Sequence, residues 1–304
     1  LHVSPSGPTN TQNSPLRSSI ILLIIILHWG IDLRPETCIE PFLNNLILIS
    51  LVESELKSIG IFITIVIWLK KLSECLNEST HKNFNKKELF KNFENDLYLA
   101  IKNKISLNPI LNSFQYTYHQ YNIDVKLVEA FMNSMRMDLH KSKYLTKEEY
   151  EAYIYGSADV VGLMCLKVFV DGDTQKYNEL KDSAMALGSA FQKVNFLRDL
   201  KDDHDILNRT YFPNTDLCNL NEDSKKLIID EIEQDFSEGL KGIKQLPMEA
   251  KFGVFMAYRY YSQLLKKLKH TPAFEIKNTR IRVPNYKKFE LLTRSYVKFQ
   301  LNLL

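Results

Sequence analysis

A ridge of amide and carboxylate side chains between residues 187 and 213 is the part of this sequence best equipped for chemistry. On a helix, which turns by about 100° per residue, positions i, i+3, i+7 and i+11 share one narrow arc. Those positions hold Gln192, Asn195, Asp199 and Asp203. The opposite arc is apolar and must be buried. Its residues are Leu187, Ala190, Phe191, Val194 and Leu197. The stretch therefore predicts a packed helix whose polar ridge is turned away from that packing.

Two carboxylates one helical turn apart, Asp199 and Asp203, could hold a hard divalent cation. Mg²⁺ prefers oxygen ligands and commonly bridges one or two carboxylates to substrate phosphates. Lys193, Arg198 and Lys201 are expected beside the ridge, where they could meet phosphate oxygens. The alternative is an amphipathic helix whose polar side faces water, although such faces more often carry Lys and Glu than the amides found here.

Composition favours one all-α domain of about ten helices. The 304 residues are 45% hydrophobic and 25% charged, as in ordinary globular proteins. Gly and Pro number only 10 each, and no segment alternates with the period of a strand. The net charge of +3 and the lack of a basic stripe interleaved with aromatics argue against nucleic-acid binding.

The four cysteines are far apart and form no C-x-x-C pair, which argues against a zinc site or a disulfide framework and suits a reducing cytosol. Residues 1–18 are rich in Ser, Pro, Asn and Thr and are expected to be disordered. Residues 19–85 are expected to form a divergent, apolar, helical N-terminal segment, and 86–304 the main helical domain. The apolar runs at 20–27, 45–52 and 59–69 are shorter than the roughly 18 residues of a membrane span. We interpret them as buried helices, with membrane anchoring as the alternative.

The ridge resembles the second aspartate-rich motif of the squalene/phytoene synthase family, Q-x-x-N-x-x-R-D-x-x-x-D followed by R-x-Y-x-P. The matching residues here are Gln192, Asn195, Arg198, Asp199, Asp203, Arg209, Tyr211 and Pro213. So many positions at fixed offsets make the resemblance specific, whereas a D-x-x-x-D pair alone would be weak.

Further segments resemble the same family. Residues 153–162, YIYGSADVVG, are similar to its Y-C-x-x-V-A-G-x-V-G pattern, with Tyr153 as the tyrosine and Asp159 as a departure from glycine. MRMDL resembles the M-x-x-D-L run and contributes Asp138. AYRYYSQLL resembles the late helix that supplies a second tyrosine, which we place at Tyr261. RIRVP resembles the R-x-x-V-P loop and offers Arg280 as a phosphate contact; the alternative is a solvated loop charge.

The family's first aspartate-rich motif, R-x-x-D-D/E-x-x-D, has no close match. At the expected place lies KLSECLNE, in which Lys71 would stand for the arginine and Glu74 and Glu78 for the aspartates. Glu has a longer side chain and Lys lacks the planar fork of Arg, so both substitutions strain a site for Mg²⁺ and diphosphate. The alternative is that residues 1–80 are divergent or replaced and that the protein is catalytically impaired.

The resemblance implies an isoprenoid (terpenoid) synthase fold, a single helical bundle around a central cavity, and a transferase of isoprenoid and carotenoid biosynthesis. The implied reaction is the head-to-head (1′–1) condensation of two allylic isoprenyl diphosphates. It implies catalytic roles for Tyr153, Tyr261, Asp199 and Asp203, and metal binding by Asp199, Asp203, Asn195, Glu74 and Glu78. Substrate contacts are implied for Gln192, Asn195, Arg198, Arg209, Tyr211, Arg280, Asp138 and Lys71.

The expected product is phytoene, made from two geranylgeranyl diphosphates, because the chain ends soon after the RIRVP loop without an apolar C-terminal anchor. Squalene or dehydrosqualene synthesis from farnesyl diphosphate is the alternative. Mg²⁺, or Mn²⁺ in its place, is the implied cofactor, and phytoene synthesis would need no NADPH. We expect a cytoplasmic monomer that touches the membrane only peripherally, for product release.

Overall fold

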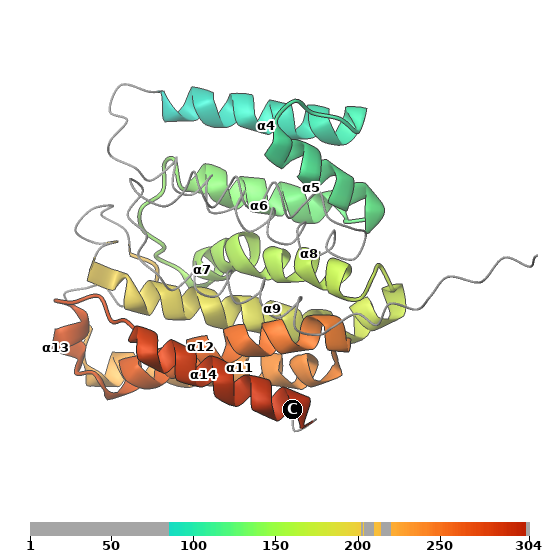
Figure 1. Cartoon of the computed structure of the whole chain (residues 1–304). Coiled ribbons are helices and arrows are strands. Elements are labelled where there is room, and N and C mark those ends of the chain that lie inside the picture. Colours follow the sequence, from blue (N-terminus) through green and yellow to red (C-terminus); the bar gives the residue numbers. More distant parts are fainter. Residues whose placement is uncertain (1–84, 202, 204–209, 214–219, 302–304) are drawn as a thin grey trace, which may run out of the picture.

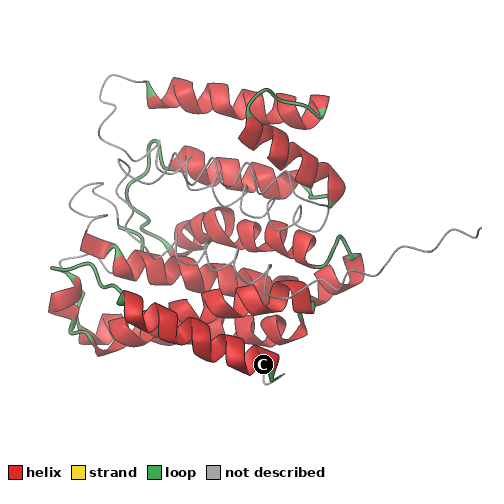
Figure 2. Cartoon of the chain, in the orientation of Figure 1, coloured by secondary structure: helices red, strands yellow, loops and turns green. Residues whose placement is uncertain are grey.

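The computed structural model describes residues 85–201, 203, 210–213 and 220–301. Predictions on Lys71, Glu74, Glu78 and Arg209, and on the segments 1–18 and 19–84, lie outside these ranges. Within them every named element is helical (Figure 2), and the nearest approach to a sheet is an isolated bridge between Lys143 and Thr210. The all-α prediction is confirmed for this part of the chain.

The described helices follow one another through short connections. They are α4 (Lys86–Asn103), α5 (Pro109–Gln120), α6 (Val125–Met137), α7 (Lys147–Ile154), the π-helical turn η1 (Tyr155–Asp159), α8 (Val160–Phe169), α9 (Thr174–Arg198), α11 (Glu222–Gln245), α12 (Met248–His270), α13 (Ala273–Ile276) and α14 (Asn285–Gln300). Because α7, η1 and α8 form one continuous helix, the described residues make nine separate helices.

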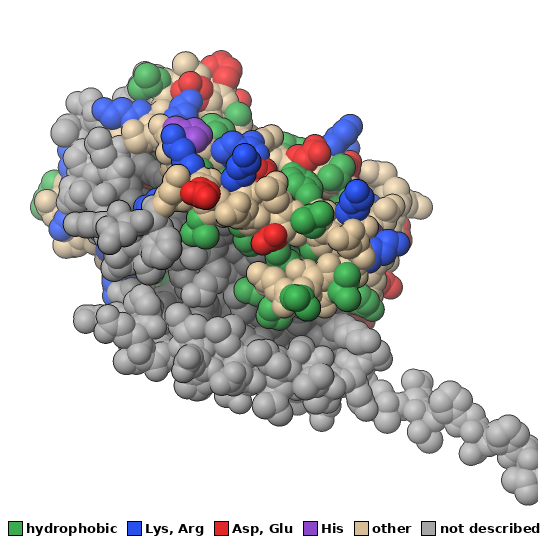
Figure 3. Space-filling model, turned by 90° about the horizontal axis from the view of Figure 1, so that it is seen from above, with side chains coloured by type: hydrophobic (Ala, Val, Ile, Leu, Met, Phe, Trp, Pro, Cys, Tyr) green, Lys and Arg blue, Asp and Glu red, His purple; other side chains and the backbone are tan. Residues whose placement is uncertain are grey.

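Helix α9 lies in the middle of the bundle (Figure 1). Helices α4, α5, α6 and α8 lie on one side of it, and α11, α12 and α14 on the other. α9 packs directly on α8 and η1 and on α11 and α12. One large apolar core joins α9 to the C-terminal helices, and a second core joins α4, α5, α6 and α8. The face of α4 and α5 seen from above carries Lys and Arg among scattered acidic and apolar side chains (Figure 3).

Glycines let the central helices approach one another closely, as the small residues of 150–170 predict. A Cβ on Gly156 would lie 2.7 Å from the carbonyl oxygen of Ala130 in α6, and one on Gly188 of α9 would lie 2.8 Å from that of Ala158. The π-helical turn that contains Ala158 therefore sits directly on the backbone of α9. π-helical turns occur frequently at functional sites.

Local capping and turn residues mark two helix ends. Thr146 is the N-cap of α7, and its hydroxyl oxygen accepts a hydrogen bond from the backbone N–H of Glu149. Asp171 and Gly172 both adopt positive φ, 52° and 75°, in the turn that precedes α9. These ends set the start of α9.

The residues 147–169 are the one described stretch long and apolar enough to cross a membrane. Just over half of its most apolar window is buried against other helices. A buried core helix satisfies the same criteria, and this stretch lies between α6 and α9.

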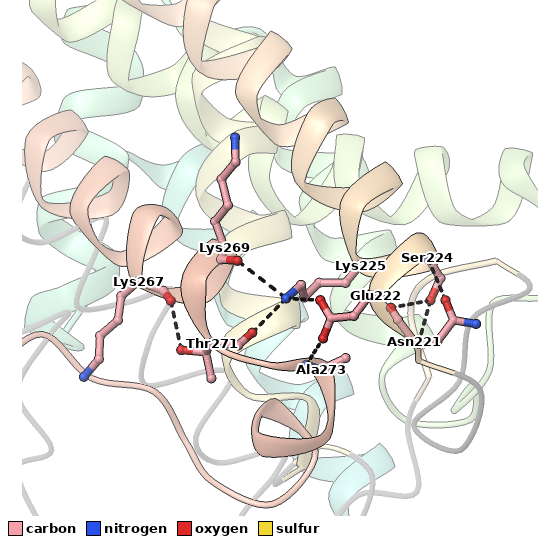
Figure 4. A network of polar contacts seen from close by, with 8 residues as sticks. All are labelled: Asn221, Glu222, Ser224, Lys225, Lys267, Lys269, Thr271 and Ala273. Atoms are coloured by element: carbon pink, nitrogen blue, oxygen red, sulfur yellow. Dashed lines mark hydrogen bonds and ion pairs between the residues drawn. The ribbon is translucent and has the colours of Figure 1, made fainter.

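A buried lysine joins the start of α11 to the end of α12 (Figure 4). Lys225 Nζ donates to the carbonyl oxygen of Thr271 at 2.8 Å and pairs with Glu222 at 2.6 Å. Glu222 in turn accepts a hydrogen bond from the backbone N–H of Ala273 at 2.6 Å. A cation is favourable at the C-terminal end of a helix, where carbonyl groups lack partners. The network fixes the chain as it leaves α12 towards the loop that carries Arg280.

Candidate active site

The polar ridge is formed by the last turns of α9. Contrary to the expectation of one helix from Leu187 onward, α9 ends at Arg198, and Asp199 is its C-cap with φ −96° and ψ 9°. The ridge nevertheless stays aligned across this point. The N–H of Asp199 donates to the carbonyl oxygen of Asn195 at 2.8 Å, and that of Asp203 to the carbonyl oxygen of Asp199 at 2.9 Å. Successive ridge residues thus lie one turn apart, as predicted.

Most of the opposite arc of α9 is buried as the periodicity predicts, but Phe191 is only partly buried and stacks on Tyr261. Ala190, Val194 and Leu197 are fully inaccessible, and Leu187 is nearly so. Gln192 and Asn195 are partly buried rather than on the open surface. The ridge therefore faces into the protein's interior, between neighbouring elements.

Two buried tyrosines flank the ridge on opposite sides. Tyr261 of α12 donates its hydroxyl hydrogen to Asn195 Oδ1 at 3.3 Å, and its ring stacks on Phe191 with centroids 4.3 Å apart. Tyr153 of α7 packs against Phe196, the residue after Asn195 and about 100° further round the helix. Burial raises the pKa of Tyr261, so its phenol stays a neutral hydrogen-bond donor. The two tyrosines assigned by resemblance are thus brought to one ridge.

Tyr153 is held by a carboxylate and by other aromatic rings. Its hydroxyl donates to Asp138 Oδ1 at 2.9 Å, so Asp138 lies beside the site as expected. Its ring centroid lies 4.5 Å from that of Tyr144 and 5.7 Å from that of Tyr211. Tyr211 in turn stacks on Phe196 with centroids 3.8 Å apart. Tyr144 was missed by sequence reasoning because its segment belongs to no recognised motif.

Backbone pairing brings Tyr211 to this cluster. The N–H of Tyr144 donates to the carbonyl oxygen of Thr210 at 3.1 Å, and the N–H of Thr210 to that of Ser142 at 2.9 Å. The segment after the ridge is therefore tied to the loop between α6 and α7. Of the R-x-Y-x-P part of the motif, the structure describes Tyr211 and Pro213, whereas Arg209 lies outside the described residues.

Asp199 is the meeting point of two guanidinium groups. Arg198 Nε lies 2.8 Å from Asp199 Oδ1, and its terminal nitrogen contacts Oδ2. Arg280 Nε, from the loop between α13 and α14, lies 2.7 Å from the same Oδ1. The interpretation of Arg280 as a solvated loop charge is therefore wrong.

The two lysines expected beside the ridge are bonded elsewhere. Lys193 is buried and pairs with Glu231 and, at 2.7 Å, with Asp235, both on α11. Lys201 Nζ donates to the carbonyl oxygen of Asn278 at 3.0 Å. Around the helix axis both residues are about 100° or more from the centre of the ridge. They therefore point towards a neighbouring helix or loop and not along the ridge.

Asp159, the departure from the family glycine, forms a polar contact between η1 and α9. Ser189 Oγ donates to Asp159 Oδ1 at 2.6 Å, and Gln192 Nε2 donates to Ser157 Oγ at 3.4 Å. Burial raises the pKa of Asp159 to about 6, although the hydrogen bond from Ser189 and the charge of Lys193 lower it. Gln192 thus meets η1, and Ser189 is a site neighbour that the motif did not indicate.

Three ridge residues, Asn195, Asp199 and Asp203, offer oxygen ligands from one amide and two carboxylates. This donor chemistry fits Mg²⁺, which takes oxygen ligands and keeps several waters. Within the described ranges no group of three His, Cys, Asp or Glu side chains is placed to hold a metal ion. A cation on the ridge would therefore complete its coordination with substrate oxygens, water or residues outside those ranges.

Comparison with known proteins decides the family. The sequence model of squalene/phytoene synthases matches residues 76–287, about 70% of the chain. This chain belongs to the squalene/phytoene synthase family. The matched range contains the ridge, both flanking tyrosines and Arg280.

Distantly related proteins include phytoene synthases. The chain is 28% identical over 207 residues to 15-cis-phytoene synthase of Synechocystis sp., covering 60% of this chain and 61% of that protein. It is 26% identical over 210 residues to phytoene synthase of Arthrospira platensis, covering 61% of this chain and 67% of that protein. The matched part thus spans about three fifths to two thirds of the length of these relatives.

Solved structures share the fold. A dehydrosqualene synthase in complex with a ligand superposes with a TM-score of 0.66 at 16% identity, covering 94% of this chain and 99% of that one. The squalene synthase HpnC from Alicyclobacillus acidocaldarius superposes with a TM-score of 0.61 at 17% identity, covering 85% and 100%. The predicted isoprenoid synthase fold is confirmed.

Proposed function

We propose that this protein is a Mg²⁺-dependent prenyltransferase that condenses two allylic isoprenyl diphosphates head to head. The observation that carries the proposal is the ridge itself: Asn195 and Asp199 lie between two buried tyrosines, with two arginines on the carboxylate. Family membership and the phytoene synthases among its relatives support this reaction class.

The described residues suit the departure of diphosphate. Arg198 and Arg280 supply planar forks that match phosphate oxygens, and Gln192 and Tyr211 are proposed to complete the polar shell. Mg²⁺, or Mn²⁺, would add charge stabilisation of the leaving group, bridging it to the ridge carboxylates. Glu74, Glu78 and Lys71 are proposed for the opposite side of the diphosphate, and Arg209 for the same side as Tyr211.

The aromatic surroundings suit the cationic half of the reaction. Beside the ridge Tyr153 stacks with Phe196 and Tyr261 stacks with Phe191, and aromatic rings attract cations to their faces. Both tyrosines are buried, so the reacting carbon would be shielded from water. Tyr153, oriented by Asp138, is proposed to assist ionisation and the final proton loss, with Tyr261 beside it.

For the substrate we propose geranylgeranyl diphosphate and for the product phytoene, without NADPH. The support is that the curated relatives named above are phytoene synthases. Farnesyl diphosphate, giving squalene or dehydrosqualene, is the alternative. We also propose that the protein acts as a monomer in the cytoplasm and meets membranes peripherally when it releases its product.

The test is to incubate the purified full chain with Mg²⁺ and either geranylgeranyl or farnesyl diphosphate, with and without NADPH, and to analyse the extracted lipid. Phytoene from geranylgeranyl diphosphate without NADPH is the expected result. Asp199→Asn should lower the turnover by at least a hundredfold, as removal of a group that stabilises transition-state charge commonly does, by about 10²–10³. Asp182→Asn, the same change at an exposed position of α9, should leave turnover unchanged.

Formation of a C30 hydrocarbon from farnesyl diphosphate would show that the substrate is farnesyl diphosphate and would leave the proposed reaction class intact. If a folded sample forms no hydrocarbon from either substrate, the proposed enzymatic activity is rejected. That result would favour a catalytically impaired member of the family, the reading suggested by Lys71, Glu74 and Glu78 in place of the first aspartate-rich motif.

A further inference from the structure

The Asp199 carboxylate is already paired with two of the protein's own arginines. A carboxylate offers about four lone-pair positions. Three of them are engaged here, two by Arg198 and one by Arg280. The contacts are sheltered, with 12% of the Arg198 side chain, 19% of Asp199 and 34% of Arg280 exposed. A cation could approach Asp199 only against two guanidinium charges.

A further cationic side chain, Lys288, lies near the two arginines, across the ring of Tyr260. Tyr260, whose pKa is raised by burial, feels the charges of both Arg198 and Arg280, and Lys288 Nζ lies 5.7 Å from the centre of its ring. Burial, followed by repulsion from Arg282, lowers the pKa of Lys288.

The loop that carries Arg280 is held in place independently of this contact. Ile281 and Val283 are buried on either side of Arg282, whose carbonyl oxygen accepts a hydrogen bond from Lys267 Nζ at 2.8 Å. On the other side, Lys201 Nζ holds the carbonyl oxygen of Asn278. Arg280 is thus presented to Asp199 by a docked backbone, and it can change its partner without the loop moving.

We infer that Arg198 and Arg280 form an anion-binding site that Asp199 fills until a diphosphate displaces it. The planar fork of Arg binds phosphate as it binds carboxylate, and diphosphate carries more negative charge than the carboxylate it would replace. The exchange moves both arginines onto the diphosphate and frees the Asp199 oxygens for a divalent cation. The identity of the anion rests on the proposed function; the internal exchange does not.

The exchange makes the binding of anion and cation mutually reinforcing. Each ligand removes the competitor that obstructs the other, and such coupling must be reciprocal. The exchange also predicts that two variants bind one partner more tightly, whereas simple removal of a binding residue would only weaken binding. Removing Asp199 should strengthen anion binding in the absence of metal, and removing Arg280 should strengthen cation binding in the absence of the anion.

The experiment is calorimetric titration of the full chain with inorganic pyrophosphate in a metal-chelating buffer and, separately, with Mg²⁺ alone. We expect Asp199→Asn to bind pyrophosphate about five- to tenfold more tightly than the wild type without metal, within the roughly 5–150-fold range of coupled sites. We expect Arg280→Ala to bind Mg²⁺ alone more tightly by a similar factor, and pyrophosphate more weakly. Arg280→Lys, which keeps the charge without the fork, should fall between wild type and Arg280→Ala.

Matched controls are Asp182→Asn and Arg294→Gln, which make comparable charge changes at exposed positions away from the ridge. Both should titrate like the wild type. Unchanged or weaker pyrophosphate binding by folded Asp199→Asn, or unchanged or weaker Mg²⁺ binding by folded Arg280→Ala, would overturn the exchange. Because neither titration requires turnover, these outcomes are distinct from failure to form a hydrocarbon.

Discussion

The Asp159 carboxylate should make the stability of this protein fall as the pH rises from about 4 to about 6. Asp159 is partly buried at the contact between η1 and α9, where it accepts a hydrogen bond from the Ser189 hydroxyl. Burial raises its pKa to about 6 in the folded state, against about 3.9 in an unfolded chain. Replacement by Asn keeps an oxygen that can accept the Ser189 hydrogen bond but removes the charge.

The sign follows from proton counting. Well below pH 4 the Asp159 carboxyl is protonated in both the folded and the unfolded state and does not lower the free energy of unfolding. Between the two pKa values the folded state binds more protons than the unfolded state, so the free energy of unfolding decreases as the pH rises. Above about pH 6 both states are ionised and the full penalty persists. The neutral amide of Asp159→Asn escapes this penalty at every pH.

The size of the effect follows from the difference between the folded and unfolded pKa of Asp159. A difference of about 2 in pKa, at about 1.36 kcal/mol per pKa unit, lowers the free energy of unfolding by about 3 kcal/mol at pH 7.5 and by about 1 kcal/mol at pH 4.5. Because the site is partly exposed and solvent screens the charge, these free energies are upper limits. At roughly 2–4 °C per kcal/mol for a large domain, Asp159→Asn should melt several degrees above the wild type at neutral pH.

The assay is thermal and urea denaturation of wild type and Asp159→Asn at pH values from about 4.5 to 7.5. The difference in unfolding free energy should grow with pH and level off above about pH 6.5. Asp182→Asn, at an exposed position of α9, should show a small difference that does not change with pH. Parallel pH profiles for wild type and Asp159→Asn would refute the reasoning, as would a variant less stable than wild type at pH 7.5.

Two further changes test the packing around α9. Gly188→Ala should cost about 1–3 kcal/mol in urea denaturation, because the new Cβ would lie 2.8 Å from the backbone carbonyl oxygen of Ala158, which cannot yield as a side chain could; an unchanged midpoint would contradict the close approach. Lys193→Met should cost up to about 3 kcal/mol by leaving the partly buried Asp235 beside Glu231 without a cation, and adding Asp235→Asn should recover part of that loss. No recovery in the double variant would contradict the pairing.

The sequence predicted which faces of the helices are buried. Most of the apolar arc of α9 was predicted correctly because helical periodicity is a local property. The ridge from Gln192 to Asp203 was likewise found by spacing, and its meaning came from resemblance. Tyr153, Asp138 and Tyr261 were assigned residue by residue in the same way, and the fold brings all three to the ridge.

Only the tertiary structure decided which groups meet across helices. Periodicity states that a face is covered but not by what, so the partners of Lys193 on α11 and of Asp199 on the Arg280 loop could not be read from spacing. The end of α9 at Arg198 has no Gly or Pro to mark it. Tyr144 enters the aromatic cluster through backbone pairing with Thr210, a contact between segments more than sixty residues apart. Local sequence fixes the elements of this protein, whereas long-range packing chooses the charge partners that its chemistry would use.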